Sequence, residues 1–339
     1  MAFSKAQKEN SMQGVKPLTV SNLDEAKQKL RARPLRIGIS TRALFKLEEE
    51  HEVFEKQGVQ AYADLQLERE NEVLEKGAAF EVVDRLLRLN ETGQEPFVQI
   101  VLLSRNSPDL SLRAFNSIKF YGLPVVTGSF TSGASLGPFI LAWKIDLFLS
   151  NEHTDVKAAI DAGTAAARLG PVSSNWQREA SDEVRIAFDG DAVVFSAESD
   201  EVYKREGLEG FRKFESQNAS KPMEGGPFGE FLKKLSVLRA IYLDENGVSK
   251  VRIGIVTARD SAAHARVINT LRAWGTPADE AHFVGQWNKA PILKAFGAHI
   301  FFDDQEKHVL GASGVVAAGH VPGPHDGSAP VIPSGDLPA

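Results

Sequence analysis

The chain repeats itself, and this repeat limits its fold more than any other feature of the sequence. Residues 35–45 align with residues 184–194 at an offset of 149, and residues 147–151 align with residues 300–304 at an offset of 153. Matching glycines, aromatic residues and apolar segments lie between them at offsets within this range. Because the register drifts by only four residues over more than a hundred, we infer an ancient duplication in which both halves share one architecture.

Each half has the same predicted order of elements: strand, charged helix, core helix, strand, amphipathic helix and last strand. The first half is predicted to place them at 37–39, 48–70, 80–89, 98–103, 110–121 and 145–149, and the second half at 184–188, 199–216, 228–238, 251–256, 262–274 and 299–302. The strands are continuously apolar, which is typical of parallel strands buried on both faces. The sequence therefore predicts an α/β protein with doubly wound parallel sheets in two tandem related lobes.

The two ends of the chain lie outside the repeat and differ from it in composition. Residues 1–34 are interpreted as a polar leader with one short helix at 22–33, ended by Pro34, and residues 312–339 as a flexible tail rich in Gly, Ala, Pro and Ser. The leader has no apolar signal core and the chain has no run of 18 apolar residues, so we expect a cytoplasmic protein that does not enter a membrane.

Charge and cysteine content exclude several classes of function. The formal net charge of -6 argues against binding of nucleic acid through the overall field. The absence of cysteine excludes disulfides, zinc sites built on thiolates and a cysteine nucleophile. The oligomeric state stays open, a homo-oligomer included.

Polar segments follow the strands of the second half, where open α/β sheets bind their ligands. These segments are Asp189-Gly190-Asp191, Thr257-Ala258-Arg259 and Asp303-Asp304, with Lys289 between the last two. Converging carboxylates repel one another unless a hard cation such as Mg²⁺ binds between them. A lysine and a threonine suit the oxygens of a phosphoryl group, and one carboxylate can attack phosphorus while a second transfers the proton. The pattern indicates a magnesium-dependent phosphatase.

These segments resemble, in order, the four motifs of the haloacid dehalogenase (HAD) superfamily: Asp189-x-Asp191-x-Val193, Thr257, Lys289 and Asp303-Asp304. Both halves also resemble the cytosolic 5′-nucleotidase type I family, through residues 103–106, 115–118, 188–196, 256–259 and 300–305. The resemblance covers about residues 35–310. It implies a HAD-like fold and Mg²⁺-dependent hydrolysis of nucleoside 5′-monophosphates, such as AMP or IMP, to nucleoside and phosphate through an aspartyl phosphate.

The resemblance also implies a role for each matched residue. Asp189 is expected to be the nucleophile, Asp191 the general acid/base, and Thr257 and Lys289 the residues that hold the phosphoryl group. Mg²⁺ would be held by Asp303, Asp304, Asp189 and the backbone carbonyl of Asp191. The neighbouring Gly190, Ala258 and Arg259 are expected to contact the substrate.

The first half lacks this set of residues. Ser40 and Arg42 stand where the second half has Asp189 and Asp191, and Leu136, Ser150 and Asn151 replace Lys289 and the aspartate pair. We therefore expect residues 35–180 to form a HAD-like lobe without catalytic aspartates and residues 181–311 to form the catalytic lobe, with a small helical cap at about 197–227. Ser104, Arg105 and Asn106 of the first half are expected near the substrate rather than in a second active site.

Two other functions stay open: a HAD phosphatase for another phosphomonoester, such as a sugar phosphate, and a non-catalytic nucleotide-binding protein. Phe195, Tyr203 and Trp287 are candidates to stack on a base, with ordinary packing in the core as the alternative.

Overall fold

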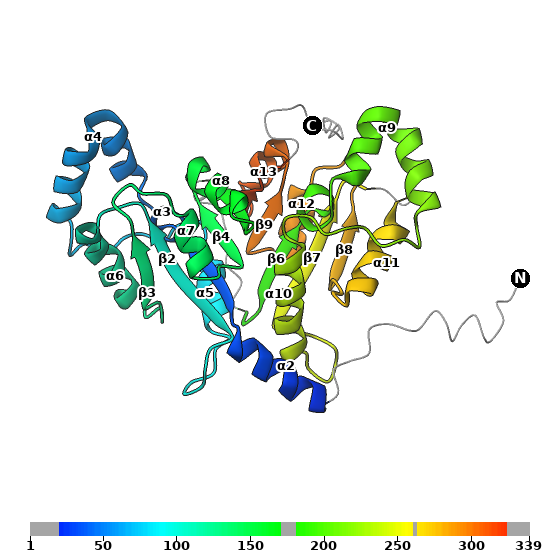
Figure 1. Ribbon diagram of the computed structural model, residues 1–339, viewed down its shortest axis with the longest axis horizontal. Coiled ribbons are helices and arrows are strands. Elements are labelled where there is room, and N and C mark those ends of the chain that lie inside the picture. Colours follow the sequence, from blue (N-terminus) through cyan, green and yellow to red (C-terminus); the bar gives the residue numbers. More distant parts are fainter. Residues whose placement is uncertain (1–19, 171–180, 260–262, 324–339) are drawn as a thin grey trace, which may run out of the picture.

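The strands of both halves lie in one continuous sheet. The computed structural model describes residues 20–170, 181–259 and 263–323, and in this part of the chain ten strands are ordered β3-β2-β1-β4-β5-β10-β9-β6-β7-β8 (Figure 1). Neighbouring strands are parallel except β5 and β10, which are antiparallel. The predicted α/β class with a mostly parallel sheet is confirmed. The separate sheets expected for two lobes are instead joined edge to edge.

We call residues 35–169 the first half and residues 184–320 the second half. The elements of the first half are β1 (Leu35–Ile39), α3 (Thr41–Leu44), α4 (Glu48–Glu68), α5 (Phe80–Leu87), β2 (Val98–Ser104), η1 (Pro108–Leu110), α6 (Ser111–Phe120), β3 (Thr127–Phe130), α7 (Gly137–Ala142), β4 (Leu147–Ser150), α8 (His153–Asp161) and β5 (Ala165–Leu169). The helix α2 (Val20–Ala32) precedes them, as predicted for the leader.

The second half repeats this order. Its elements are β6 (Val184–Phe188), η2 (Gly190–Val194), α9 (Glu198–Gln217), α10 (Gly229–Ile241), β7 (Val251–Thr257), α11 (His264–Trp274), β8 (Glu280–Phe283), α12 (Ala290–Phe296), β9 (Ile300–Asp303), α13 (Glu306–Ala312) and β10 (Ala317–His320). Read from the outer edge inward, the strand orders are 3-2-1-4-5 and 8-7-6-9-10. This order is compatible with a HAD-like fold.

The correspondence between the halves extends to single hydrogen bonds and to helix kinks. The backbone N–H of Leu74 donates to Ser117 Oγ at 3.0 Å, and that of Met223 donates to Thr270 Oγ1 at 3.0 Å. The long helices α4 and α9 each bend at a glycine, with φ of 86° at Gly58 and 67° at Gly207. Both values lie in the left-handed region that favours glycine. The two kinked helices stand at the upper left and upper right of Figure 1.

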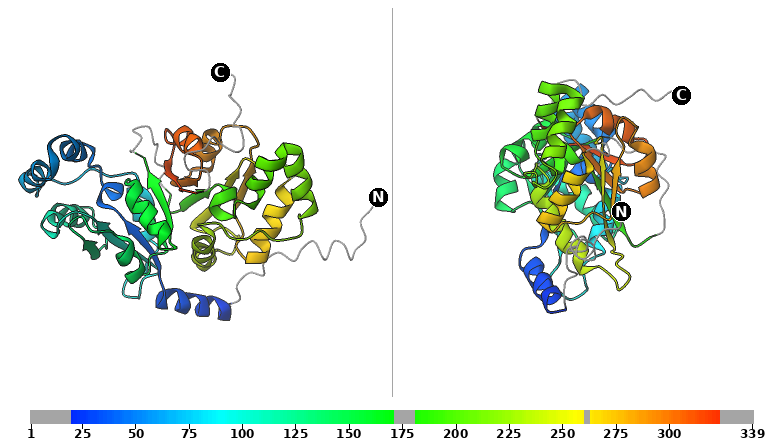
Figure 2. Two further views of the ribbon diagram at one scale, coloured as in Figure 1. Left: turned by 45° about the horizontal axis from the view of Figure 1, so that its top comes forward. Right: turned by 90° about the vertical axis from the view of Figure 1, so that its right-hand side faces the viewer.

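Alternating side chains of the strands build a core on each face of the sheet. On one face a single apolar cluster runs through both halves, with Ile37 and Ile100 of the first half and Ile186 and Ile253 of the second among its members. The opposite face has one cluster under α7 and α8 and another under α12 and α13. Helix α2 lies outside these layers and contacts α10, as Figure 2 shows from two further directions. None of the described helices is long and apolar enough to span a bilayer.

The start of the predicted tail is wrong, because residues 317–320 form β10 in the middle of the sheet. This strand is parallel to β9 and antiparallel to β5, and all four of its residues are buried. Its sequence Ala-Ala-Gly-His has low intrinsic strand propensity, so it gave no signal. Small residues are required here, since a Cβ on Gly319 would lie 2.9 Å from the ring of Phe302 and 3.0 Å from Ala167 Cβ. Residues 324–339 of the predicted tail lie outside the described part of the chain.

Candidate active site

The predicted nucleophile lies where the central strand of the second half ends. The backbone N–H of Asp189 donates to the carbonyl of Phe302 at 2.8 Å, which extends the β6–β9 pairing by one residue. The chain then makes the wide turn η2, in which Ala192 adopts a left-handed backbone conformation with φ of 56°. Every residue of this turn is buried. The turn therefore presents Asp189 at a fixed position beside the end of β9.

Lys289 joins two of the predicted carboxylates. Its Nζ atom lies 2.5 Å from Asp189 Oδ1 and 2.7 Å from Asp303 Oδ2, although 100 and 14 residues separate these partners in the sequence. Lys289 is only 2% exposed, so its charge is compensated by the two carboxylates rather than by water. The sequence prediction that Lys289 belongs with the aspartates agrees with this geometry.

Asp304 completes a group of three buried carboxylates. Among the described residues, Asp189, Asp303 and Asp304 can each offer one oxygen within 4.8 Å of the others. His320 of β10 lies 3.1 Å from the carbonyl of Asp304, and the N–H of Val321 donates to the carbonyl of Asp303 at 2.9 Å. The strand missed by sequence reasoning thus supports the turn that carries the aspartate pair.

The protonation behaviour of these carboxylates indicates a shortage of positive charge. Burial, opposed by Lys289, raises the pKa of Asp189 to about 8. Burial and the charges of Asp303 and Asp189 raise the pKa of Asp304 to about 10. Burial also disfavours the charge of Asp303, but Lys289 and His308 hold its pKa at about 2. Three buried carboxylates with one ammonium are the donor set that a divalent cation with oxygen ligands would complete.

Thr257 and Gly190 lie against each other at this cluster. A Cβ on Gly190 would lie only 3.2 Å from Thr257 Oγ1, so the glycine gives the threonine hydroxyl access to the turn. The hydroxyl also accepts the N–H of Arg259 at 3.3 Å. Thr257 is 1% exposed, and Ala258, which follows it, is partly buried.

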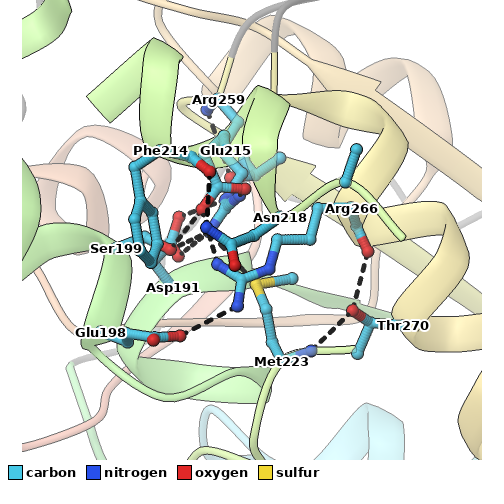
Figure 3. A network of polar contacts seen from close by, with 12 residues as sticks. Asp191, Glu198, Ser199, Phe214, Glu215, Asn218, Met223, Arg259, Arg266 and Thr270 are labelled. Atoms are coloured by element: carbon cyan, nitrogen blue, oxygen red, sulfur yellow. Dashed lines mark hydrogen bonds and ion pairs between the residues drawn. The ribbon is translucent and has the colours of Figure 1, made fainter. Parts of the chain in front are cut away.

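Arg259 does not have the position expected of a substrate ligand. Its guanidinium is completely buried and donates to both carboxylate oxygens of Asp191, at 2.8 Å to Oδ2 and 2.6 Å to Oδ1. It also contacts Glu215 and Ser199 (Figure 3). The side chain of Asp191 is thereby turned to Arg259, and it is not a member of the group of three carboxylates. A buried arginine could not be recognised from the tripeptide Thr-Ala-Arg alone.

His308 also lies at the site, although the sequence analysis did not include it among the candidate residues. The Nδ1 atom of His308 lies 3.2 Å from Asp303 Oδ2, and the side chain is 9% exposed. His308 lies in the first turn of α13, after the chain reverses direction behind Asp304, and no local sequence pattern predicts this reversal.

The three candidate aromatic residues have different environments. Phe195 is fully buried and packs on Trp274 with ring centroids 5.6 Å apart, so it belongs to the core. Tyr203 packs edge-on against Phe211 of the same helix. Trp287, two residues before Lys289, is 72% exposed. Only Trp287 of these three presents most of its ring to solvent.

The first half contains a separate cavity of about 510 Å³ at the ends of its own strands. Its lining residues all lie between positions 40 and 155, and include Ser40, Arg42, Ser104, Arg105 and Asn106. The last three were expected near the substrate, but the structure places them here with none of the catalytic aspartates. The reason is the strand order: β2, which ends at Ser104, lies near one edge of the joined sheet, and β7, which ends at Thr257, lies near the other edge.

Two arginine side chains that line this cavity are bonded to other protein groups. Arg42 bonds to Glu48 at 2.8 Å and to Glu152 at 2.9 Å, and Arg105 donates to the carbonyl of Gly133 at 3.0 Å. Burial, opposed by Arg105, raises the pKa of Asp155 to about 6. The cavity therefore has no counterpart of the three clustered carboxylates.

Comparison with known proteins places this geometry in a family. A family model described as 5′-nucleotidase matches residues 26–327. The human cytosolic 5′-nucleotidase 1B is 34% identical over 293 aligned residues, and the match covers 83% of this chain and 48% of that protein. The chain spans about half the length of this curated relative. No solved structure matches the chain significantly.

Proposed function

This chain belongs to the 5′-nucleotidase family, and we propose that it hydrolyses nucleoside 5′-monophosphates to nucleoside and phosphate in a Mg²⁺-dependent reaction. The observation that carries the proposal is the buried group of Asp189, Asp303 and Asp304, of which Asp189 and Asp303 are paired with Lys289. Family membership supports the substrate class. The donor set supports phosphoryl transfer, because it combines a carboxylate nucleophile with sites for a hard cation and for phosphate oxygens.

In the proposed reaction Asp189 attacks the phosphorus atom. The new bond joins Asp189 Oδ to phosphorus, and the bond from phosphorus to the 5′-oxygen breaks. Asp191 gives its proton to the departing 5′-oxygen, so the nucleoside leaves as a neutral alcohol. Asp191 then accepts a proton from the water that attacks the aspartyl phosphate, which releases phosphate and restores both carboxyl groups.

Lys289 and Thr257 would hold the phosphoryl group during both steps. The ammonium of Lys289 lies 2.5 Å from the nucleophilic oxygen, so it is next to any phosphate positioned for attack. The hydroxyl of Thr257, at the end of β7, borders Gly190 of the turn after β6, and Gly190 and Ala258 would contact the substrate beside it. A fixed ammonium and hydroxyl stabilise charge on the equatorial oxygens of the transition state.

The residues present fit a divalent cation. Asp189, Asp303 and Asp304 would hold it, joined by the backbone carbonyl of Asp191, and all three carboxylates are buried together. When bound, Mg²⁺ would neutralise charge on the phosphate and on these carboxylates.

The same proposal covers the architecture. We take the two halves as duplicated HAD-like lobes, of which residues 35–180 lost the catalytic aspartates and residues 181–311 retained them. Residues 197–227, which contain α9, would act as a cap that excludes water and selects the substrate. Support comes from the repeated strand order and from the glycine kinks at equivalent positions of α4 and α9.

A substrate panel tests the function. Phosphate release is measured for AMP, IMP and other nucleoside monophosphates and for sugar phosphates, with Mg²⁺ and with EDTA. The proposal expects hydrolysis of nucleotides with Mg²⁺ and none with EDTA. If the protein prefers sugar phosphates, its substrates are sugar phosphates and not nucleotides. If it binds nucleotides without releasing phosphate, it is a non-catalytic nucleotide-binding protein.

A further inference from the structure

A buried ion-pair network connects the predicted acid/base to the long helix of the second half. Arg259 bonds to both oxygens of Asp191, at 2.8 and 2.6 Å, and the exposed fractions of the two side chains are 0% and 6% (Figure 3). Two parallel N–H···O bonds fix the plane of a carboxylate as well as its position. Asp191 is thereby held in a single orientation.

The other side of Arg259 is held by α9. Its guanidinium contacts Glu215 and donates to Ser199 Oγ at 2.7 Å, and Ser199 donates to Glu215 at 2.7 Å. Glu215 also accepts from Arg266 of α11 at 3.0 Å and has no exposed side-chain surface. Breaking a buried pair of this kind leaves an uncompensated charge, so α9 is tied to Arg259.

The first half retains one part of this network. Arg113, the counterpart of Arg266, bonds to Glu50 at 2.7 Å and to Gln66 at 3.0 Å, and Gln66 stands at the position of Glu215. Each arginine also donates from Nε to a backbone carbonyl, Arg113 to Glu72 at 3.2 Å and Arg266 at 3.1 Å to the equivalent residue. In both halves an arginine of the amphipathic helix, α6 or α11, thus bonds to the long helix, α4 or α9.

Among the described residues, an arginine links the long helix to the turn after the first strand in the second half and not in the first. The counterparts of Arg259 and Asp191 are Asn106 and Arg42. Asn106 donates to the hydroxyl of Tyr62 at 3.0 Å, and Arg42 bonds to Glu48 and Glu152. The half that carries the aspartates is thus the one in which an arginine connects α9 to the Asp189–Asp191 turn.

We propose that Arg259 is a positioning residue that fixes the plane of the Asp191 carboxylate, the acid and base of the proposed mechanism, and, through Glu215, couples this orientation to the placement of α9. The proposal rests on the function proposed above. Arg259 acts through Asp191, because its buried guanidinium is fully engaged by protein groups and has no surface for the substrate. A displacement of α9 must move or break the pair between Glu215 and Arg259, so cap position and carboxylate orientation change together.

The proposal has a chemical signature in the leaving group. A nucleoside leaves as a strongly basic alkoxide unless it receives a proton, whereas p-nitrophenolate leaves without one. Misplacing Asp191 should therefore slow the hydrolysis of AMP much more than that of p-nitrophenyl phosphate. A role in stability alone would lower both rates equally.

The experiment compares kcat/KM for AMP and p-nitrophenyl phosphate in wild type, Arg259→Lys and Glu215→Gln, with Mg²⁺ present. Lysine keeps the charge but cannot form the two parallel bonds, and glutamine is the residue that the first half has at the position of Glu215. We expect the ratio of p-nitrophenyl phosphate to AMP activity to rise about tenfold or more in Arg259→Lys and less in Glu215→Gln. Arg113→Lys in the first half is the matched control and should leave the ratio unchanged.

An unchanged ratio in folded variants, with both activities lowered together, would overturn the proposal. If Arg259→Lys does not fold, the ratio in Glu215→Gln decides. A failure of the proposed function gives a different result, because the wild-type protein would then not hydrolyse nucleotides. In that case the activity ratio is measured between p-nitrophenyl phosphate and whichever alkyl phosphate of the panel the wild-type protein hydrolyses. A wild type that hydrolyses no phosphate ester would overturn both.

Discussion

Ser40 and Asp189 have the same backbone environment. Each follows the first strand of its half, and each donates its N–H to the neighbouring strand, Ser40 to Leu149 at 2.9 Å and Asp189 to Phe302 at 2.8 Å. The side chains differ in what they meet: Ser40 caps the short helix α3 by accepting the N–H of Ala43, and Asp189 meets Lys289. The chain therefore offers a matched control for each catalytic substitution.

Asp189→Asn should lower turnover of AMP at least about a thousandfold, because an amide cannot form the acyl phosphate. The fold should persist, since the amide keeps the size of the side chain. Phosphate release and thermal unfolding measure the two effects. Ser40→Asn, at the same backbone position, should leave turnover unchanged, and more than a tenth of wild-type activity in Asp189→Asn would contradict the mechanism.

Asp304→Asn should weaken the binding of Mg²⁺ at least about tenfold, because one of three clustered carboxylates is removed. A cation that binds only the folded state raises the melting temperature, so a Mg²⁺ titration followed by thermal unfolding reports binding without activity. Asn151→Ala, the counterpart in the first half, should not change the Mg²⁺-dependent rise. Equal titrations for wild type and Asp304→Asn would exclude Asp304 as a ligand.

Trp287→Ala should raise the KM for AMP about two- to tenfold, since a stacked aromatic pair contributes about 0.5–1.5 kcal/mol. The indole is 72% exposed beside the loop that carries Lys289, where it can lie against a base. Phe120→Ala removes another exposed aromatic, at the end of α6, and serves as the control. The idea fails if Trp287→Ala leaves the KM unchanged.

His299 should make the fold sensitive to acid. Its Nδ1 accepts the N–H of Arg185 at 2.8 Å, and burial, with Arg85 and Arg185, lowers its pKa to about 3. The unfolded chain binds this proton near pH 6.5, so stability is complete above pH 6.5 and falls as the pH decreases toward 3.

Urea unfolding at several pH values tests this acid sensitivity with His299→Asn, whose side-chain oxygen can accept the same N–H. The free energy of unfolding of wild type should fall relative to the variant by at most about 1.4 kcal/mol per pH unit below pH 6.5. Parallel pH profiles for the two proteins would show that His299 does not contribute.

Gly319→Val should destabilise the junction of the two halves by about 1–3 kcal/mol, because the added atoms would overlap Phe302 and Ala167. Activity should fall with stability, since the neighbouring His320 and Val321 hold the Asp303–Asp304 turn. Gly323→Ala is the control, because an added Cβ would meet only the carbonyl oxygen of Val321, at 3.9 Å. Wild-type stability in Gly319→Val would mean that the junction tolerates larger side chains.

Elements whose own residues determine them were predictable from the sequence. The strands β1, β2, β6 and β7 are rich in Ile, Val and Leu, and Asp189, Thr257 and Asp303 follow from where such strands end. The strands β3, β5, β8 and β10 were missed, because these short segments contain few large apolar residues and become strands only where neighbouring strands pair with them.

The residues missed at the site share a different cause. Glu215 and His308, and the pairing of the predicted residue Arg259 with Asp191, depend on contacts between different elements of the fold. The direction of a long side chain depends on those contacts, and sequence spacing does not record them. The motif around Thr257 placed Arg259 at the right strand end, but only its packing shows that it faces Asp191.

The position of β10 has a consequence for the order in which the chain can fold. Among the described strands this one comes last in the sequence, yet it lies between β5 and β9 at the centre of the sheet. Until it emerges, the inner edges of both halves expose unpaired backbone groups of the kind that recruit foreign strands. During synthesis the two halves can therefore fold before the sheet is continuous, and their inner edges stay unpaired until β10 pairs with β5 and β9.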